Sequence, residues 1–450
     1  MKPPFLPAAV GTLSASTSPQ RSHGPRRRLP AHLGARLSLG LSLLFLLTVA
    51  TGCETLVGPG NGDPDPPPPA ITQLPRDLSG AEEEAIRQGN AFGFRLLSEL
   101  AGADPNGTIF ISPLSASMAL GLTLTGADGS TFQAMQETLG LHGLSRDEIN
   151  EAYRALLELL VELDPDVELA VANSVWHRDD LTPHPAFLQE TEDYFGARIQ
   201  GLDFSSPQAA GTINDWVREA TRDRIKEIVD NPIDPQVVAI LLNAVYFKAG
   251  WTDVFDPERT REEPFHLLDG SSEPAEFMIR DDTLRYYSAD RYAAVDLPYA
   301  GQAFSMTVVV PHEGERIHDL VQELDPQEWD EIIQGLTTTR VQLWLPRFEV
   351  EWESSLNDPL SAMGMGEAFQ PGANFSRMFQ DASPWIDEVK QKSFIRVDEE
   401  GTEAAAVTSV VMATSMPPQL RADRPFLFAI RERLTGTILF MGLVVEMPRL

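Results

Sequence analysis

The side chains that could carry out catalysis are scattered along the 450-residue chain and form no catalytic motif. We find no G-x-S-x-G nucleophile elbow, no H-E-x-x-H zinc motif, no Gly-Lys-Ser/Thr phosphate loop and no paired-cysteine site. The eight histidines share no motif spacing (His23, His32, His142, His177, His184, His266, His312, His318). The sequence therefore predicts a protein that is not an enzyme and uses neither a cofactor nor a metal ion.

The most informative segment, residues 399–416, reads E-E-G-T-E-A-A-A-V-T-S-V-V-M-A-T-S-M and stops at Pro417 and Pro418. It opens at Gly401, continues through small residues and enters a β-favouring run from Val407 to Val411. With the strand period of two, one face carries only small or compact side chains (Thr402, Ala404, Ala406, Thr408, Val410, Met412). The segment is therefore suited both to an exposed loop and to an additional strand inside a sheet.

A surface helix starting at residues 402–406 is the other interpretation, because Thr-Glu-Ala-Ala-Ala has good helix propensity. The downstream runs A-D-R-P-F-L-F-A-I at 422–430 and I-L-F-M-G-L-V at 438–444 favour the strand. Together with the E-E-G-T-E-A-A-A hinge, and with T-I-F-I-S-P-L-S-A-S-M-A-L at 108–120, they resemble the serpin superfamily of serine protease inhibitors.

The resemblance covers residues 78–448 and implies an α+β fold. Helices would pack around a large central mixed β-sheet, with two smaller sheets and an exposed reactive-centre loop. The mostly apolar runs at 169–176 and 237–247 look like central strands buried on both faces. Past residue 75 we find no linker, repeat or low-complexity run, so we expect one large domain at 78–450.

The resemblance also implies a mechanism. Inhibitory serpins are metastable: a protease attacks the loop, forms an acyl-enzyme, and is distorted when the cleaved loop inserts into the sheet. The working parts would be a hinge, a bait bond and a latch. The hinge must enter the sheet without a clash, and Thr402 is expected to pass from solvent to the inner face. The hinge residues are Glu400, Gly401, Thr402, Glu403, Ala404, Ala405 and Ala406.

The reactive bond can be placed at two adjacent positions. Counting forward from Gly401 by the usual loop length gives Ser415–Met416, whereas counting back from the A-D-R-P-F run gives Thr414–Ser415. Either way the residue before the cut is small and uncharged, which favours elastase-like or subtilisin-like targets over trypsin- or thrombin-like ones. Met412 would suit a chymotrypsin- or elastase-like enzyme if cleavage occurs early.

Five further residues match family positions. Ser112, Ser115, Asn243 and Gln391 match a latch that hydrogen-bonds behind the sheet where it must part. Gln391 stands where family members commonly carry histidine, so we expect the network to lose its pH response. The alternative for these residues is an ordinary buried polar cluster. Trp251 matches the tryptophan at the top of the sheet where insertion begins, or is plain core.

The N-terminus resembles a bacterial lipoprotein signal. Basic residues (Arg21, Arg26, Arg27, Arg28) precede a short apolar run at 37–50, and V-A-T-G-C ends at Cys53. Ala50 replaces the preferred leucine, and a plain signal peptide is the alternative. We expect a signal at 1–52 and, at 53–77, a lipidated Cys53 on a Pro/Gly-rich tether. The protein would be exported and lipid-anchored at the cell envelope, facing periplasm or extracellular space.

The formal charge of −31 limits the partners. Nucleic acid and anionic membrane need a basic surface, so membrane contact is expected through the lipid only. Heparin is not expected either, because residues 147–168, where a basic helix would lie by resemblance, are rich in Glu and Asp. Cys53 is the only cysteine, which excludes an intrachain disulfide. We expect a monomer that binds serine proteases covalently.

Two functions remain in view. The first is a suicide-type inhibitor of serine proteases with small or apolar primary pockets, guarding a bacterial cell envelope. The second is a non-inhibitory serpin that acts as a surface binding or structural module. The hinge favours inhibition, because non-inhibitory members tend to carry bulky, charged or proline residues there, whereas Glu403 is the only charge between Gly401 and the proline pair.

Overall fold

The computed structural model describes residues 70–234, 236–402 and 417–447, which carry helices and three β-sheets of nine, four and two strands. This is the predicted α+β fold. Among these residues, none of the helices is both long and apolar enough to cross a membrane. Cys53, the signal, residues 53–69 of the tether and residues 403–416 of the loop lie outside the described part of the chain.

The four-stranded sheet has the order β12-β4-β2-β3. Its two long strands, β2 (Val167–Arg178) and β4 (Ala239–Gly250), are antiparallel and correspond to the two apolar runs predicted as central strands. β3 (Arg198–Leu202) pairs in parallel with β2 on the outer side. β12 is the two-residue hinge strand Gly401–Thr402, which pairs with the opposite edge of β4.

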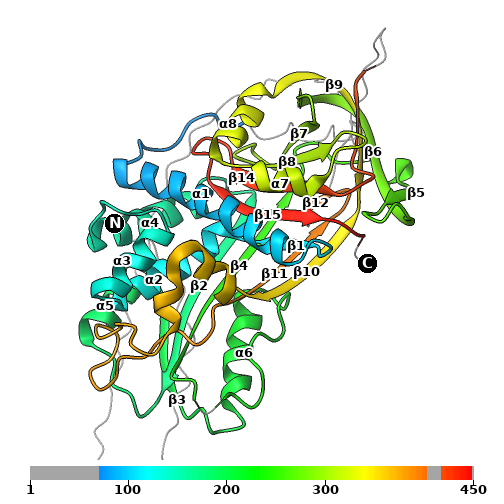
Figure 1. The fold of residues 1–450 in the computed structure, drawn as a ribbon. Helices are drawn as coiled ribbons and strands as arrows, with labels where there is room; N and C mark the ends of the chain where they lie inside the picture. The colour runs from blue at the N-terminus through cyan, green and yellow to red at the C-terminus, as the bar shows by residue number, and fades with distance from the viewer. Residues whose placement is uncertain (1–69, 235, 403–416, 448–450) are drawn as a thin grey trace, which may run out of the picture. The chain divides into compact units, whose positions relative to one another are not determined.

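The two-stranded sheet lies beside this edge (Figure 1). β10 (Phe348–Ser355) pairs antiparallel with β11 (Lys390–Val397), and β11 leads through a tight turn into β12. Within the described part of the chain, β4 and β11 belong to separate hydrogen-bonded sheets. We call their facing edges the β4–β11 seam.

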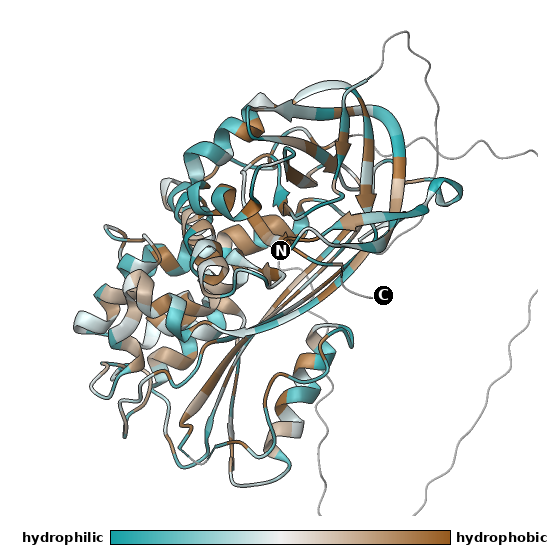
Figure 2. Cartoon of the chain, turned by 45° about the vertical axis from the view of Figure 1, so that its right-hand side comes forward, coloured by the Kyte–Doolittle hydropathy of each residue, from teal (hydrophilic) through white to brown (hydrophobic). Residues whose placement is uncertain are grey.

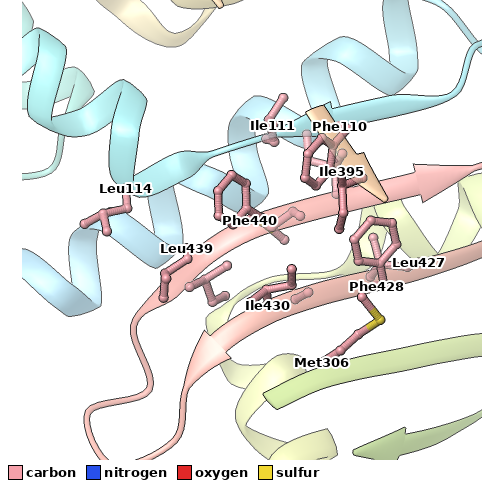
Figure 3. Close-up of a cluster of buried hydrophobic side chains, with 14 of the residues drawn as sticks. Phe110, Ile111, Leu114, Met306, Ile395, Leu427, Phe428, Ile430, Leu439 and Phe440 are labelled. Carbon is pink, nitrogen blue, oxygen red and sulfur yellow. The ribbon is translucent and has the colours of Figure 1, made fainter. Parts of the chain in front are cut away.

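The nine-stranded sheet has the order β1-β15-β14-β8-β7-β6-β9-β13, with β5 paired to β6. Its strands are β1 (Ile109–Ile111), β5 (Arg261–His266), β6 (Ser272–Ser288), β7 (Tyr292–Pro298), β8 (Phe304–Pro311), β9 (Thr337–Pro346), β13 (Gln419–Arg421), β14 (Phe426–Glu432) and β15 (Ile438–Val444). Figure 3 shows where it meets β11: Ile395 lies among Phe110, Phe428 and Phe440, and the Phe110 ring stacks on the Phe440 ring at 5.4 Å.

The helices cover the sheets (Figure 1). They are α1 (Gly80–Ala103), α2 (Pro113–Gly126), α3 (Gly129–Thr138), α4 (Arg146–Glu162), α5 (Pro185–Phe195), α6 (Ala209–Ala220), α7 (Ile317–Glu323), α8 (Pro326–Gly335) and α9 (Asn357–Leu360). α2 begins at the predicted place: the Ser112 side chain caps it by accepting from the Ser115 N–H, and Pro113 occupies the first turn, where proline is tolerated.

The two faces of β4 contact different layers. Phe247, Ala249 and Trp251, at the odd positions, belong to the main core, whereas Leu242 packs with α6 residues such as Ile213. Figure 2 shows apolar residues along the long strands and along α6. Since strand side chains alternate between faces, even-numbered residues of β4 point to the α6 side and odd-numbered residues to the core.

Residues 70–77, at the end of the predicted tether, contact the folded domain. The Ile71 N–H donates to the Gly301 carbonyl at 2.8 Å, and the Arg76 guanidinium bonds Glu82 at 2.5 Å and the Ala155 carbonyl at 3.0 Å. Ile71 and Leu74 also pack against the main core. The last residues before 78 are therefore held on the surface of the domain.

Candidate functional site

The hinge begins as a tight antiparallel turn between β11 and β12. Asp398 and Gly401 exchange two backbone hydrogen bonds, of 3.1 and 3.3 Å. Gly401 has φ of +143°, and a Cβ there would lie 2.5 Å from the Ala249 carbonyl oxygen. Only glycine therefore lets the chain pass this close to β4. The Glu399 and Glu400 carbonyls accept from the backbone N–H groups of Phe255 and Trp251 at 2.9 and 3.0 Å, which fixes the turn.

Thr402 corrects the expectation that the hinge starts in solvent. It pairs with Ala249 on β4 and is only 4% exposed, and its hydroxyl lies 3.0 Å from the Tyr299 hydroxyl. The physical reason is that Ala249 is small and the Tyr299 phenol, whose pKa burial raises, offers a partner inside the core. The first residue of the predicted inner face therefore already occupies a strand position in the sheet.

Trp251 lies beside this entry point. It is 5% exposed, its indole N–H donates to the Asp398 carbonyl at 2.9 Å, and its ring stacks on the Tyr299 ring with centroids 4.5 Å apart. Trp251 thus contacts the turn that leads into the hinge, and Tyr299 contacts the hinge itself. The tryptophan is at once core and part of the hinge support.

The four predicted latch residues come together behind the seam. The Gln391 side chain, on β11, accepts from the Ser112 N–H at 3.3 Å and donates to the Ser112 carbonyl at 3.1 Å. On the other side, the Ser115 hydroxyl donates to the Asn243 side-chain oxygen on β4. Since the Ser115 N–H bonds the Ser112 hydroxyl at 3.2 Å, the start of α2 connects the two strands that flank the seam.

Two members of this site were missed by sequence reasoning. Asn173 on β2, 2% exposed, accepts from the Asn243 amide at 2.7 Å and donates to the Phe195 carbonyl at 3.0 Å. A polar residue inside the apolar run at 169–176 was the available signal. No sequence signal identified Tyr299, because only the turn between β7 and β8 brings it to Thr402.

Two small cavities open along the seam. The upper one, of about 20 Å³, is lined by Thr402, by Tyr246 and Phe247 of β4, and by Phe394 and Arg396 of β11, among others. The lower one, of about 230 Å³, is lined by residues 239–242 of β4 and by Lys390 of β11, with the segment after α6. Below β12, space along the seam therefore occurs together with strand edges that pair with no other strand of the described residues.

The far end of the loop is also anchored. The Pro418 carbonyl accepts from the Gln342 N–H at 2.9 Å, where β13 joins β9. Arg421 is engaged, because its guanidinium lies over the Trp344 ring at 4.4 Å and bonds Asp423 at 3.0 Å. The residues between the two ends, including Glu403, Ala404, Ala405, Ala406, Thr414, Ser415 and Met416, lie outside the described part of the chain.

Comparison with known proteins agrees with the fold. The family model described as "Serpin (serine protease inhibitor)" matches residues 87–447. Iripin-2 of Ixodes ricinus is 33% identical over 385 residues, which cover 82% of this chain and 95% of that protein. Human neuroserpin is 32% identical over 377 residues, covering 81% of this chain and 91% of its own.

Solved structures give the same result. The thermophilic serpin tengpin in the native state aligns with a TM-score of 0.75 and 31% identity, over 84% of this chain and 97% of that one. Native protease nexin-1 with heparin aligns with a TM-score of 0.75 and 27% identity, over 81% of this chain and 100% of that one. The fold and the matching family model define a protein of the serpin class. The chain belongs to the serpin family, and its general function is inhibition of serine proteases rather than catalysis.

Proposed function

We propose that the protein is a suicide-type inhibitor of serine proteases with small or apolar primary pockets, acting by insertion of residues 402–412 into the β4–β11 seam. The observation that carries the proposal is the position of Thr402, which is paired with Ala249, buried, and bonded to Tyr299 at the head of the seam. A strand that has begun to pair needs only to continue in the same register.

The register of this pairing predicts where each following residue would go. Because Thr402 faces Ala249 in an antiparallel pair, residues 404, 406 and 408 would face Phe247, Val245 and Asn243. The turn pairing of Asp398 with Gly401 gives the partners on β11 in the same way. It places residue 408 opposite Gln391, so Thr408 would enter between the two strand members of the latch.

The faces agree with this register. Directly opposed residues share a face, so the small even-numbered residues of the loop would point to the core, as Thr402 does. The lower cavity of about 230 Å³ lies at residues 239–242 of β4, which the register assigns to residues 409–412. The apolar Val410, Val411 and Met412 would fill it.

The reaction needs no catalytic group of the inhibitor. The protease serine Oγ would attack the Ser415 carbonyl carbon, its proton would pass through the protease histidine to the leaving Met416 nitrogen, and the C–N bond would break. The acyl ester on Ser415 would then be carried along the seam as the loop inserts. A small P1-type residue such as serine fits elastase-like and subtilisin-like pockets.

Location is the second part of the proposal. The motif V-A-T-G-C with a single cysteine, Cys53, supports lipid anchoring at a cell envelope, and the tether at 53–77 would hold the domain off the membrane. The alternative function is a non-inhibitory surface module, which would keep the same resting hinge contacts but would not trap a protease.

The experiment is incubation with pancreatic elastase and with subtilisin, followed by denaturing electrophoresis and mass spectrometry. An SDS-resistant complex whose acyl group maps to Ser415 or Thr414 supports inhibition. In parallel, clean cleavage within residues 411–416 should raise the melting temperature by tens of degrees, because a complete strand is added to the sheet. Turnover of the loop without a complex, and no gain in melting temperature, would favour the non-inhibitory module.

A further inference from the structure

The segment that follows α6 crosses the β4–β11 seam on the α6 side. Arg224 and Ile225 of this segment line the upper cavity together with Tyr246 of β4 and Phe394 of β11. Tyr246 is an even-numbered residue of β4 and points to the α6 side. Phe394 points the same way, because its neighbour Ile395 packs in the main core and strand side chains alternate. The segment therefore meets both edges of the seam on the face opposite the latch.

The Arg224 side chain contacts both edges. Its guanidinium lies 5.5 Å from the centre of the Phe394 ring on β11, within the range of a cation–π interaction. Toward β4 it hydrogen-bonds the Tyr246 side chain, which is 8% exposed. Burial raises the pKa of the Tyr246 phenol, and the Arg224 guanidinium acts against that rise. One arginine thus connects two strands that, among the described residues, do not pair with each other.

Arg222, two residues earlier, contacts the other side of the seam. It forms an ion pair with Glu168 of β2, and its guanidinium lies 5.8 Å from the centre of the Tyr246 ring on β4. β2 and β4 pair with each other along their length, so both contacts belong to one sheet. Arg222 therefore fixes the segment to one edge of the seam, and Arg224 reaches from there to the other.

The backbone between the two arginines has an unusual conformation. Arg222 and Asp223 have φ of +49° and +63°, in the left-handed region that residues other than glycine rarely adopt. Such residues persist where surrounding contacts hold them. The Asp223 N–H donates to the Arg218 carbonyl at 2.8 Å, which closes the turn at the end of α6. Arg224 follows this turn directly, and the turn places its side chain over the seam.

A strand added to the seam would be incompatible with both contacts of Arg224. Neighbouring strands in a sheet lie about 4.8 Å apart, so a strand between β4 and β11 would hold them roughly 10 Å apart. A cation–π contact extends to about 6 Å from the ring centre. Arg224 would therefore have to leave either Tyr246 or Phe394.

We propose that Arg224 is a positioning residue that connects the two edges of the seam on the α6 side in the resting protein and releases one of them when a strand enters. We call its two contacts the Arg224 clasp. The proposal rests on the proposed loop insertion. The latch connects the same two strands on the core side, through the start of α2. Because the clasp is complete only before insertion, it stabilises the resting state relative to the inserted one.

The test compares Arg224→Gln with the wild type before and after loop cleavage by subtilisin or elastase. The uncleaved variant should melt about 1–4 °C below the uncleaved wild type. The loss should be smaller in the cleaved protein, where only one of the two contacts remains. On warming, the uncleaved variant should lose inhibitory activity about two- to thirtyfold faster, the range that one cation–π contact implies. Arg224→Lys, which keeps a cation, should restore most of both properties.

Arg222→Gln is the matched control, because it makes the same change in the same segment but affects contacts on one side of the seam. It should lower the melting temperatures of the uncleaved and the cleaved protein equally. In a Phe394→Leu background, Arg224→Gln should cause a smaller further loss, since the two residues are in contact.

Two outcomes separate the clasp from the proposed function. An Arg224→Gln protein that loses as much stability after cleavage as before it would overturn the clasp while leaving inhibition intact. A wild type that neither traps a protease nor gains stability on cleavage would overturn the proposed function itself.

Discussion

The hydroxyl groups of Tyr299 and Thr402 lie 3.0 Å apart, both inside the core, so the turn between β7 and β8 is bonded to a residue of the predicted hinge. Tyr299 also stacks on Trp251, which holds the Asp398 carbonyl. The predicted hinge is therefore supported from the core side in the resting structure.

Tyr299→Phe should weaken the resting and the cleaved protein equally. Thr402 already has its strand register, so its hydroxyl bond to Tyr299 would be present in both states. A lost hydrogen bond corresponds to about 1 kcal/mol, which lowers the melting temperature by less than about 4 °C. Calorimetry of both forms measures this. A loss confined to one form would show that the bond breaks on insertion.

Thr402→Arg should destabilise the uncleaved protein as well as block insertion. The side chain at 402 is 4% exposed, and an unpaired buried guanidinium costs on the order of 3–5 kcal/mol. The variant should be cut by elastase and should release it active. Thr402→Ser, which keeps the hydroxyl, is the control. An uncleaved Thr402→Arg protein that melts with the wild type would contradict the buried position.

Gln391→Ala should loosen the latch, because the Ser112 N–H and carbonyl would both lose a side-chain partner. Leaving buried groups unsatisfied costs about 1–3 kcal/mol. The expected result is faster spontaneous loss of inhibitory activity on warming, measured as the rate of conversion to a non-inhibitory monomer. Gln391→Glu can accept from the Ser112 N–H but cannot donate when ionised. Its rate of conversion should therefore lie between those of the wild type and Gln391→Ala. An unchanged rate for Gln391→Ala would remove Gln391 from the latch.

Asp164→Asn should stabilise the protein near neutral pH. The Asp164 carboxyl is 1% exposed, one oxygen has no hydrogen-bond partner, and burial raises its pKa. A raised carboxyl pKa means that the penalty for ionisation is absent below the unfolded value of about 3.9 and complete above the folded value. The melting temperature should therefore rise at pH 7 and converge with the wild type toward pH 4. Asp166→Asn, on the exposed neighbour, is the control. An equal gain at both pH values would point to packing instead.

Cys53→Ala tests the anchor. If Cys53 carries a lipid, the wild type should partition into detergent and the variant into the aqueous phase when each is expressed with its own signal in a bacterial host. Ser79→Ala, at the helix cap of the folded domain, should leave partitioning unchanged. Identical partitioning of wild type and Cys53→Ala would exclude a lipid at this residue.

Local sequence was enough to predict the strands β2 and β4, the start of α2 and the glycine of the hinge. Each depends on information within a few residues: an apolar run for a strand buried on both faces, a serine before a proline for a helix start, a glycine before small residues for a turn. The latch residues were predicted only through family resemblance, because residues 112, 243 and 391 are distant in sequence and nothing local relates them.

By itself, the sequence determined the period-two pattern of the loop, the single glutamate at 403 and the glycine at 401. The structure gives the reason for that glycine, since the backbone of Gly401 passes too close to β4 for a side chain. Tertiary structure decided that Thr402 is already buried and that Tyr299 is its partner. The physical reason is that register between strands depends on backbone hydrogen bonds across the sheet. Those bonds join residues separated by about 150 positions in the chain, so no local pattern can report them.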